Sequence, residues 1–208
     1  MEESGVGCMT GKKERGRPRS PEVDREILRA AMLVMARGGY ARMSVEEVAT
    51  EAGVSRPTIY LRYGGKAELA TAALAAYRDR GRPEETGDTR ADLVARLRHF
   101  RRGVERPFGM AMIGSVLAEE HITPELLALF RERLVEPRRG ELREVLEHAK
   151  DRGELKETGD VEAAVNMLVG SYYAQYLAGD PFPEDWPEAV VETVLAGIER
   201  TDAGLSGG

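Results

Sequence analysis

The stretch TEAGVSRPTIYLRYGGKAEL, which runs from Thr50 to Leu69, decides the fold of this chain. Just upstream, Ser44-Val-Glu-Glu47 forms a capping box that opens a short helix to about Ala52, and Gly53-Val-Ser55 is expected to form a tight turn. A second short helix is predicted from Arg56 to about Arg62. The pattern indicates a helix-turn-helix, in which the second helix enters the major groove of DNA, although a generic helical hairpin has similar spacing. The apolar residues expected between the two helices are Val48, Ala49, Ala52, Val54 and Ile59.

The segments on either side of this stretch are also predicted to be helical. Upstream, apolar residues at helical spacing predict a helix that Pro21 opens and Gly38-Gly39 ends. Downstream, a helix is predicted from Lys66 to about Arg80, followed by a polar loop at residues 81–89. Every later apolar run has helical spacing, and Pro137 is expected to kink or break one of these helices. No segment alternates as a strand does, so the sequence predicts an all-α fold with about nine helices.

Charge is distributed unevenly along the chain, which carries a net charge of −6 as a whole. Residues 1–80 hold 14 basic and 11 acidic side chains, a net +3, whereas residues 81–208 hold 16 and 25, a net −9. This asymmetry is expected when only the first part of a protein meets an anionic partner such as nucleic acid. A chance fluctuation on a soluble surface is the alternative.

The composition is that of a soluble globular protein, with 42% hydrophobic and 32% charged residues in a chain of 208. The most apolar stretch, from Ala163 to Gly179, contains Asn166 and Gln175 and falls short of a membrane span. The N-terminus lacks the apolar core of a signal peptide, and one cysteine, Cys8, cannot form a disulfide framework. These features favour a cytoplasmic protein without a membrane partner.

The run from Thr50 to Leu69 closely resembles TetR-family transcriptional regulators, in which the recognition helix ends in an aromatic pair and a lysine begins the fourth helix. The stretch ILRAAMLVMARGGYARMSVEEVA, from Ile27 to Ala49, is similar to that family's first helix and entry turn. Gly, Ser and charged residues dominate residues 1–20, which predicts a disordered basic arm. The resemblance implies a three-helix DNA-binding domain at residues 21–66. It also implies a helical ligand-binding and dimerisation domain at residues 67–208.

Side-chain chemistry and this resemblance together predict the residues at the DNA. Arginine can bind guanine bidentately, a threonine methyl can meet a thymine methyl, and a helix N-terminus favours phosphate. The resemblance implies that Tyr60 contacts phosphate, whereas Tyr63 is expected to lie half in the core. Gly64-Gly65 replaces the polar capping residues common in the family, which predicts a looser clamp. The predicted set is Ser44, Val45, Arg56, Pro57, Thr58, Tyr60, Arg62, Tyr63 and Lys66, with a solvated charged face as the alternative for Arg62 and Lys66.

The basic arm carries a motif of its own, the pentapeptide from Arg15 to Arg19, in which Arg17 is the central residue. It resembles the core of an AT-hook, an extended segment that inserts arginines into the narrow minor groove of A·T-rich DNA. The prediction is a minor-groove or non-specific contact by Arg15, Arg17 and Arg19. A merely solubilising basic tail is the alternative.

The stretch from Val161 to Trp186 resembles the penultimate helix of a TetR-type C-terminal domain, in which a small residue precedes a tyrosine pair. In that family the last two helices of each subunit form an intermolecular four-helix bundle, so the resemblance implies a homodimer. A two-fold dimer also matches a palindromic operator. An ordinary buried helix is the alternative. The predicted interface consists of Val169, Gly170, Tyr173, Leu177, Val190, Val194 and Ile198.

Large, soft side chains in the C-terminal part suit an adaptable pocket for a small apolar or amphipathic ligand, and they suit a plain core equally well. No catalytic motif, metal site or cofactor loop is present, and His99, His121 and His148 are isolated, so no cofactor and no enzymatic activity are predicted. Arg138-Arg139 is expected on a solvated face. The predicted pocket residues are Phe108, Met110, Met112, Ile113, Phe130, Met167 and Tyr172.

The function predicted from these features is that of a repressor that binds a palindromic double-stranded operator as a dimer and is released by a small-molecule effector. One alternative keeps the fold and makes the protein an activator or a ligand-independent DNA-binding protein. The other is a helical small-molecule enzyme that uses His99 or His121 as a base. The lack of a convergent acid-base constellation disfavours that enzyme.

Overall fold

A computed structural model describes residues 20–78, 81–106 and 109–199, and their regular secondary structure is helical throughout, as predicted. The predicted AT-hook residues Arg15, Arg17 and Arg19, and the predicted pocket residue Phe108, lie outside the described residues. The helices are α1 (Pro21–Arg42), α2 (Val45–Ala52), α3 (Arg56–Tyr60), α4 (Lys66–Arg78), α5 (Thr89–Val104), α6 (Gly109–Ala118), α7 (Pro124–Phe130), a π-helical turn η1 (Arg131–Val135), α8 (Glu136–Asp151), α9 (Val161–Ala178) and α10 (Trp186–Ile198).

The predicted helix-turn-helix forms with the capping that its sequence specifies. The Ser44 hydroxyl accepts a hydrogen bond from the Glu47 amide, and the Glu47 carboxylate accepts one from the Ser44 amide. Gly53 ends α2 with a φ of 66°, in the left-handed region that glycine adopts without steric cost. Both features confirm the prediction that this segment consists of two short helices around a glycine turn.

Pro137 neither breaks nor sharply ends the helix that contains it. A proline ring clashes with the carbonyl group four residues before it, which is here the carbonyl of Arg133. The chain relieves this clash in η1, where the Glu136 amide donates to the Arg131 carbonyl over five residues. The helical segments α7, η1 and α8 therefore run on without interruption, and the described residues form nine separate helical rods.

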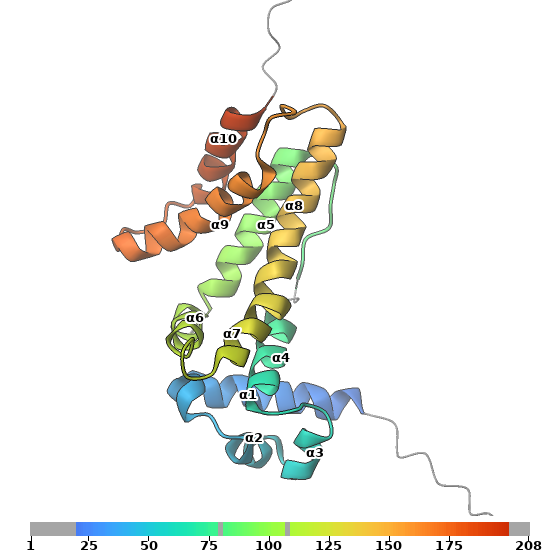
Figure 1. Ribbon diagram of the computed structural model, residues 1–208, viewed down its shortest axis with the longest axis vertical. Helices are drawn as coiled ribbons and strands as arrows, with labels where there is room; N and C mark the ends of the chain where they lie inside the picture. Colours follow the sequence, from blue (N-terminus) through green and yellow to red (C-terminus); the bar gives the residue numbers. More distant parts are fainter. Residues whose placement is uncertain (1–19, 79–80, 107–108, 200–208) are drawn as a thin grey trace, which may run out of the picture.

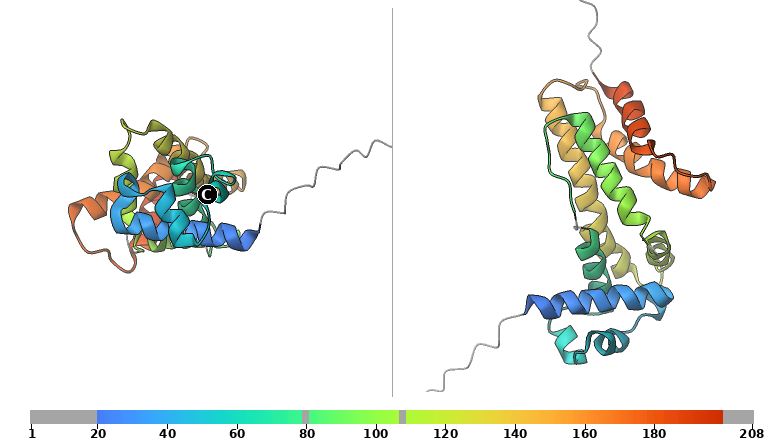
Figure 2. Two further views of the ribbon diagram at one scale, coloured as in Figure 1. Left: turned by 90° about the horizontal axis from the view of Figure 1, so that it is seen from below. Right: turned by 180° about the vertical axis from the view of Figure 1, so that it is seen from behind.

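The helices are arranged in two levels (Figure 1). Helix α1 lies across the lower end of the molecule, with α2 and α3 beneath it, and α4 leads upward from this group. The antiparallel pair α5 and α8 forms the long axis above, and α9 and α10 pack on one side of that pair (Figure 2). Among the described residues, no helix combines the length and apolarity that a membrane-spanning helix requires.

The structure has two hydrophobic cores, and their residues coincide only in part with the two levels of helices. The upper core joins α5, α8, α9 and α10, and at its centre Tyr172 stacks on Phe182 with ring centroids 4.5 Å apart. The lower core joins α1 to α4 but also includes side chains of α6, α7 and η1, such as Met112 and Phe130. The segments α6, α7 and η1 thus pack directly against α1 and α4, the two helices that flank α2 and α3 in the chain.

Candidate nucleic-acid interface and ligand cavity

The recognition helix α3 is held in place by its cap and by one apolar anchor. The Ser55 hydroxyl accepts from the Thr58 amide and lies 2.8 Å from the Thr58 hydroxyl, and Ile59 is buried in the lower core. The side chains of Arg56, Pro57 and Tyr60 are exposed, with Tyr60 at 49%. The structure thus brings three of the predicted contact residues together on the solvent side of α3.

A neighbouring carboxylate holds Arg56 in the absence of DNA. One guanidinium nitrogen of Arg56 lies 3.5 Å from the Glu46 carboxylate, and both side chains are more than half exposed. Such a solvated ion pair is worth little, about 0–1 kcal/mol, so a phosphate or a guanine can displace it. Arg56 is therefore positioned by α2 while remaining available to DNA.

Arg62 does not lie where the prediction placed it, because it belongs to the protein interior. Its guanidinium forms an ion pair with Asp24 of α1, with an Nε–Oδ1 distance of 2.9 Å, and its side chain is only 13% exposed. This ion pair fastens the end of the recognition segment to the first helix. We therefore leave Arg62 out of the proposed base contacts.

The remaining predicted DNA residues are occupied by contacts within the protein. Lys66 donates to the Ala41 carbonyl at 3.1 Å and lies 4.2 Å from the centre of the Tyr40 ring, and burial lowers its pKa. Val45 is buried, so only its backbone amide is available to a phosphate. Tyr63 packs half-buried on the lower core, as expected.

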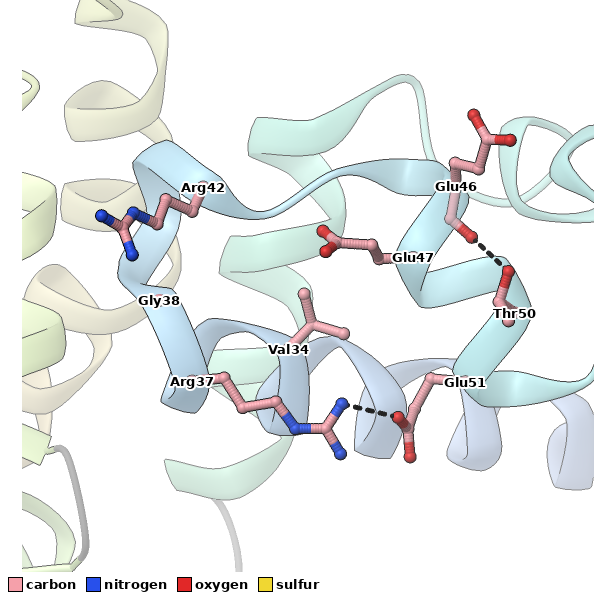
Figure 3. Close-up of a pocket in the computed structure, with 8 residues that line it drawn as sticks. All are labelled: Val34, Arg37, Gly38, Arg42, Glu46, Glu47, Thr50 and Glu51. Carbon is pink, nitrogen blue, oxygen red and sulfur yellow. Dashed lines mark hydrogen bonds and ion pairs between the residues drawn. The ribbon is translucent and has the colours of Figure 1, made fainter.

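A hollow in the lower level lies between α1 and α2 and has a volume of about 690 Å³. Figure 3 shows that Arg37 reaches across it to Glu51, with 2.9 Å between Nη1 and Oε2. Glu46 and Glu47 also line it, and none of the predicted site residues does. Arg42 also lines it, so the wall holds two arginines and three carboxylates, and we do not place DNA in this hollow.

A second, mainly apolar cavity of about 370 Å³ lies where the two levels meet. Helices α1, α4, α5, α6, α7 and α8 and the turn η1 all contribute to its wall. Its volume lies within the usual range of small-molecule sites. Three predicted pocket residues, Met112, Ile113 and Phe130, line it. The other apolar lining side chains are Met32, Leu33, Ala36, Leu74, Val104 and Leu134.

The other predicted pocket residues lie elsewhere. Met110 is half-buried against the upper core, and Tyr172 is buried among aromatic rings at the centre of that core. Met167 is 51% exposed on the outer face of α9. Large soft side chains suit a core, a cavity and an interface alike, which is why their type did not separate these three locations.

Arg138, expected on a solvated face, is instead largely buried at the cavity wall. Its guanidinium lies 4.6 Å from the centre of the Phe100 ring, and burial lowers its pKa. Its neighbour Arg139 donates to Asn166 and Glu162 of α9. Helical periodicity showed two adjacent arginines but not that η1 rotates one of them inward.

Two polar contacts tie the cavity wall to the helix-turn-helix, and neither was predicted. In the first, Arg133 of η1 donates to the Glu68 carboxylate at 3.3 Å, and this carboxylate accepts from the Gly64 amide at 2.5 Å. The Gly64 amide and the Arg133 guanidinium hold the pKa of Glu68 below its usual range. Glu68 thus caps the Gly64-Gly65 turn that the sequence alone indicated to be a loose clamp.

In the second tie, the Ser115 hydroxyl of α6 accepts from the Tyr40 amide at 3.0 Å. This contact lies at the kink of α1, where Gly39 has a φ of 72°. A Cβ at Gly39 would lie 3.1 Å from the Ser115 hydroxyl oxygen, so the close approach of α6 also requires glycine there. The two ties reach the chain just before α2 and just after α3.

One face of α9 carries apolar side chains that are exposed among the described residues. Met167, Gly170, Ala174 and Leu177 follow one face of α9 at helical spacing, and Leu177 is 82% exposed. Of the other predicted interface residues, Val169, Tyr173, Val190 and Ile198 are half-buried, whereas Val194 is buried in the upper core.

Comparison with known proteins places both levels in one family. Residues 27–73 match the family described as bacterial regulatory proteins, tetR family, and residues 83–194 match the tetracyclin repressor-like C-terminal domain.

Individual relatives match over nearly their full length. An HTH-type transcriptional regulator of Mycobacterium bovis is 30% identical over 91% of this chain and 95% of its own. The DNA-binding transcriptional repressor TetR of Mycobacteroides abscessus is 30% identical over 85% and 94%. The crystal structure of the TetR family transcription regulator SCO0332 is 30% identical and covers 85% of this chain and 98% of its own, with a TM-score of 0.69.

Proposed function

Because this chain belongs to the TetR family of DNA-binding transcriptional regulators, we propose that it is a repressor that binds a palindromic operator as a homodimer and is released by a small effector. The observation that carries the proposal is the capped helix α3, which presents Arg56, Pro57 and Tyr60 together to solvent. We take residues 21–66 as the DNA-binding unit and residues 67–208 as the regulatory unit.

Repression is the direction that the relatives favour, since the Mycobacteroides abscessus relative is named a transcriptional repressor. A dimer seated on an operator would block the access of RNA polymerase to overlapping promoter DNA. The proposed contacts are Arg56, Pro57, Thr58 and Tyr60 on α3, with Lys66 and the amides at the start of α2 near the phosphates. The arm with Arg15, Arg17 and Arg19 would add minor-groove contacts.

The apolar face of α9 supports the proposed dimer. Adjacent exposed apolar residues in a soluble protein mark an interaction surface, and the same face on two subunits is self-complementary about a two-fold axis. We place Met167 in this interface together with Gly170, Tyr173 and Leu177. The half-buried residues Val169, Val190 and Ile198 would lie at its margin.

The cavity between the two levels is the proposed effector site, since an occupant there touches elements that hold the helix-turn-helix. A ligand against Met112 and Ile113 displaces α6, whose Ser115 holds the kink of α1. A ligand against Phe130 and Leu134 displaces η1, whose Arg133 holds Glu68. An effector acts only through its different affinities for the DNA-binding and released states.

The test of this function is a fluorescence-anisotropy titration of the protein with the intergenic DNA beside its own gene, at two salt concentrations. A repressor of this type should bind tightly, with an affinity that falls steeply as salt rises, and DNase footprinting should protect a discrete palindrome. If the affinity equals that for random DNA, the prediction that this intergenic DNA contains an operator is wrong. Extended coverage in the footprint would instead favour an architectural DNA-binding protein, and transcription assays separate repression from activation.

Arg133→Met tests the tie between η1 and Glu68. We expect operator affinity to fall about 2- to 10-fold, the range for charged hydrogen bonds that remain partly exposed, because the Gly64-Gly65 turn loses part of its support. Hydrogen exchange of the Gly64 amide should accelerate in parallel. Arg131→Met, an exposed arginine of the same turn, is the control. If the two variants bind the operator with equal affinity, the contact between Arg133 and Glu68 does not support operator binding.

A further inference from the structure

The wall of the cavity carries a charge pattern opposite to that of the surrounding sequence. Residues 81–208 have a net charge of −9. Nevertheless, three arginines, Arg78, Arg106 and Arg138, line the cavity, and no Asp or Glu is among its described lining residues. The rest of the wall is formed mainly by apolar side chains. A site with this lining favours a ligand that is apolar over most of its length and anionic at one end.

Arg138 is the arginine of this set whose guanidinium makes no hydrogen bond or ion pair with the described residues, whereas Arg106 donates to the Tyr77 carbonyl and Arg78 pairs with Glu141. The Arg138 guanidinium lies over the face of the Phe100 ring, and the nearby Tyr173 and Glu141 favour its charged form. The nearby Glu141 carboxylate already serves Arg78 at 3.8 Å and Arg82 at 3.5 Å. A guanidinium remains charged in proteins, and burying it without a carboxylate or phosphate partner costs free energy.

The position of Arg138 lets it serve a ligand without large movement. Its side chain lines the apolar cavity and also a smaller hollow formed with Gly170 and Tyr173 of α9. Nη2 lies 3.8 Å from the position that a Cβ would occupy at Gly103, an ordinary van der Waals distance, so the guanidinium lies beside the α5 backbone. The planar guanidinium presents paired N–H donors that match a carboxylate or a phosphate.

From this arrangement we infer that the effector is an amphipathic anion, with an apolar chain in the cavity between α1, α4 and α6 and an anionic head group on Arg138. This inference rests on the proposed effector site. Arg106, which donates to the Tyr77 carbonyl at 3.0 Å, and Arg78 supply further positive potential around that head group. Either a carboxylate or a phosphate can serve as this head group, because both are anionic and accept the paired N–H donors of a guanidinium.

The experiment is isothermal titration calorimetry of the full chain with four probes of equal chain length, used below their micelle concentrations: decanoate, decyl phosphate, decanol and decylammonium. At least one anion should bind about 10- to 100-fold more tightly than decanol, which is the range for a hydrogen-bonded charge, and decylammonium should bind most weakly. The preferred anion tells a carboxylate from a phosphate effector. Equal affinities for the anions and decanol would overturn the inference.

Variants in α8 test whether the preference for anions over decanol depends on the side chain of Arg138. Arg138→Met should lower anion affinity 10- to 100-fold and leave decanol affinity within about 2-fold, because the apolar part of the site remains. Arg138→Lys should retain part of the anion preference. Arg143→Met on the same helix, an arginine that pairs with Glu162 outside the cavity, should leave all four affinities unchanged. Circular dichroism checks that each variant is folded, and an Arg138→Met variant that keeps the anion preference would contradict the assignment.

An operator-release assay with the same probes separates this inference from the proposed function. Anion-selective binding that leaves the operator complex intact would support the ligand class and contradict effector release through this site. Release by decanol but by neither anion would support the effector site and overturn the anionic head group. Release by an anion that fails in Arg138→Met would support both.

Discussion

Replacing Arg56 and Tyr60 together with alanine should lower operator affinity by about 1,000-fold or more, to the level of non-specific binding, while leaving the fold intact. Good contacts to DNA are worth about 1–3 kcal/mol each, and a dimer loses each of them in both half-sites. Both side chains are exposed, and the anchor of α3, Ile59, is untouched, so thermal unfolding should change little. Anisotropy titrations against the operator measure the loss.

The salt dependence of operator binding by the single variants Arg56→Ala and Tyr60→Ala shows whether each side chain contributes a cation to phosphate. Loss of a cation that neutralises a phosphate reduces the slope of log K against log salt by about 0.9 for each phosphate, whereas loss of a neutral contact leaves that slope unchanged. Tyr60→Ala should therefore lower affinity without changing the slope, because a neutral phenol that donates to phosphate releases no counterion. Arg56→Ala should reduce the slope if its cation meets phosphate and leave it nearly unchanged if it meets guanine. Arg131→Ala, at an exposed arginine of η1, is the control. Undiminished operator affinity in the double variant would contradict the assignment of α3 as the reading helix.

The features predicted successfully from sequence are those fixed by neighbouring residues. The capping box at Ser44, the turn at Gly53 and the burial of Ile59 all follow from chemistry within a few positions along the chain. The all-α class follows in the same way, since each helix carries its own apolar periodicity. Local rules therefore predicted that α2 and α3 form and that a glycine turn joins them.

The features that sequence did not predict depend on partners distant in the chain. Arg62 looked like a base-reading residue, but its partner Asp24 lies on α1, 38 positions upstream. Arg138 looked solvated, yet the π-helical turn before Pro137 places it against Phe100 of α5. The link from Glu68 to Arg133 joins residues 65 positions apart. Periodicity assigns a side chain to a helix face, but it does not say what that face meets.

Placing carboxylates on the uncovered face of α9 should separate the dimer and with it abolish tight operator binding. In Met167→Glu/Leu177→Glu, two like charges per subunit would meet their copies across the two-fold axis, where they cannot be solvated. A monomer engages one half-site, so the gain from linking two binding modules, about 100- to 10,000-fold, disappears. Sedimentation velocity measures the assembly state, and anisotropy measures the operator affinity of the same samples.

The control for this variant is Ile122→Glu, because Ile122 is also an exposed large apolar residue but lies in the turn between α6 and α7. It should leave both the dimer and the operator affinity unchanged. If Met167→Glu/Leu177→Glu stays dimeric, the subunits meet through another surface and the α9 face has a different partner. If it becomes monomeric yet binds the operator as tightly as the unmodified chain, one helix-turn-helix suffices, and the reading of a palindrome by a two-fold dimer is excluded. Loss of both properties together is the result expected when the α9 face holds two recognition helices at the spacing of two half-sites.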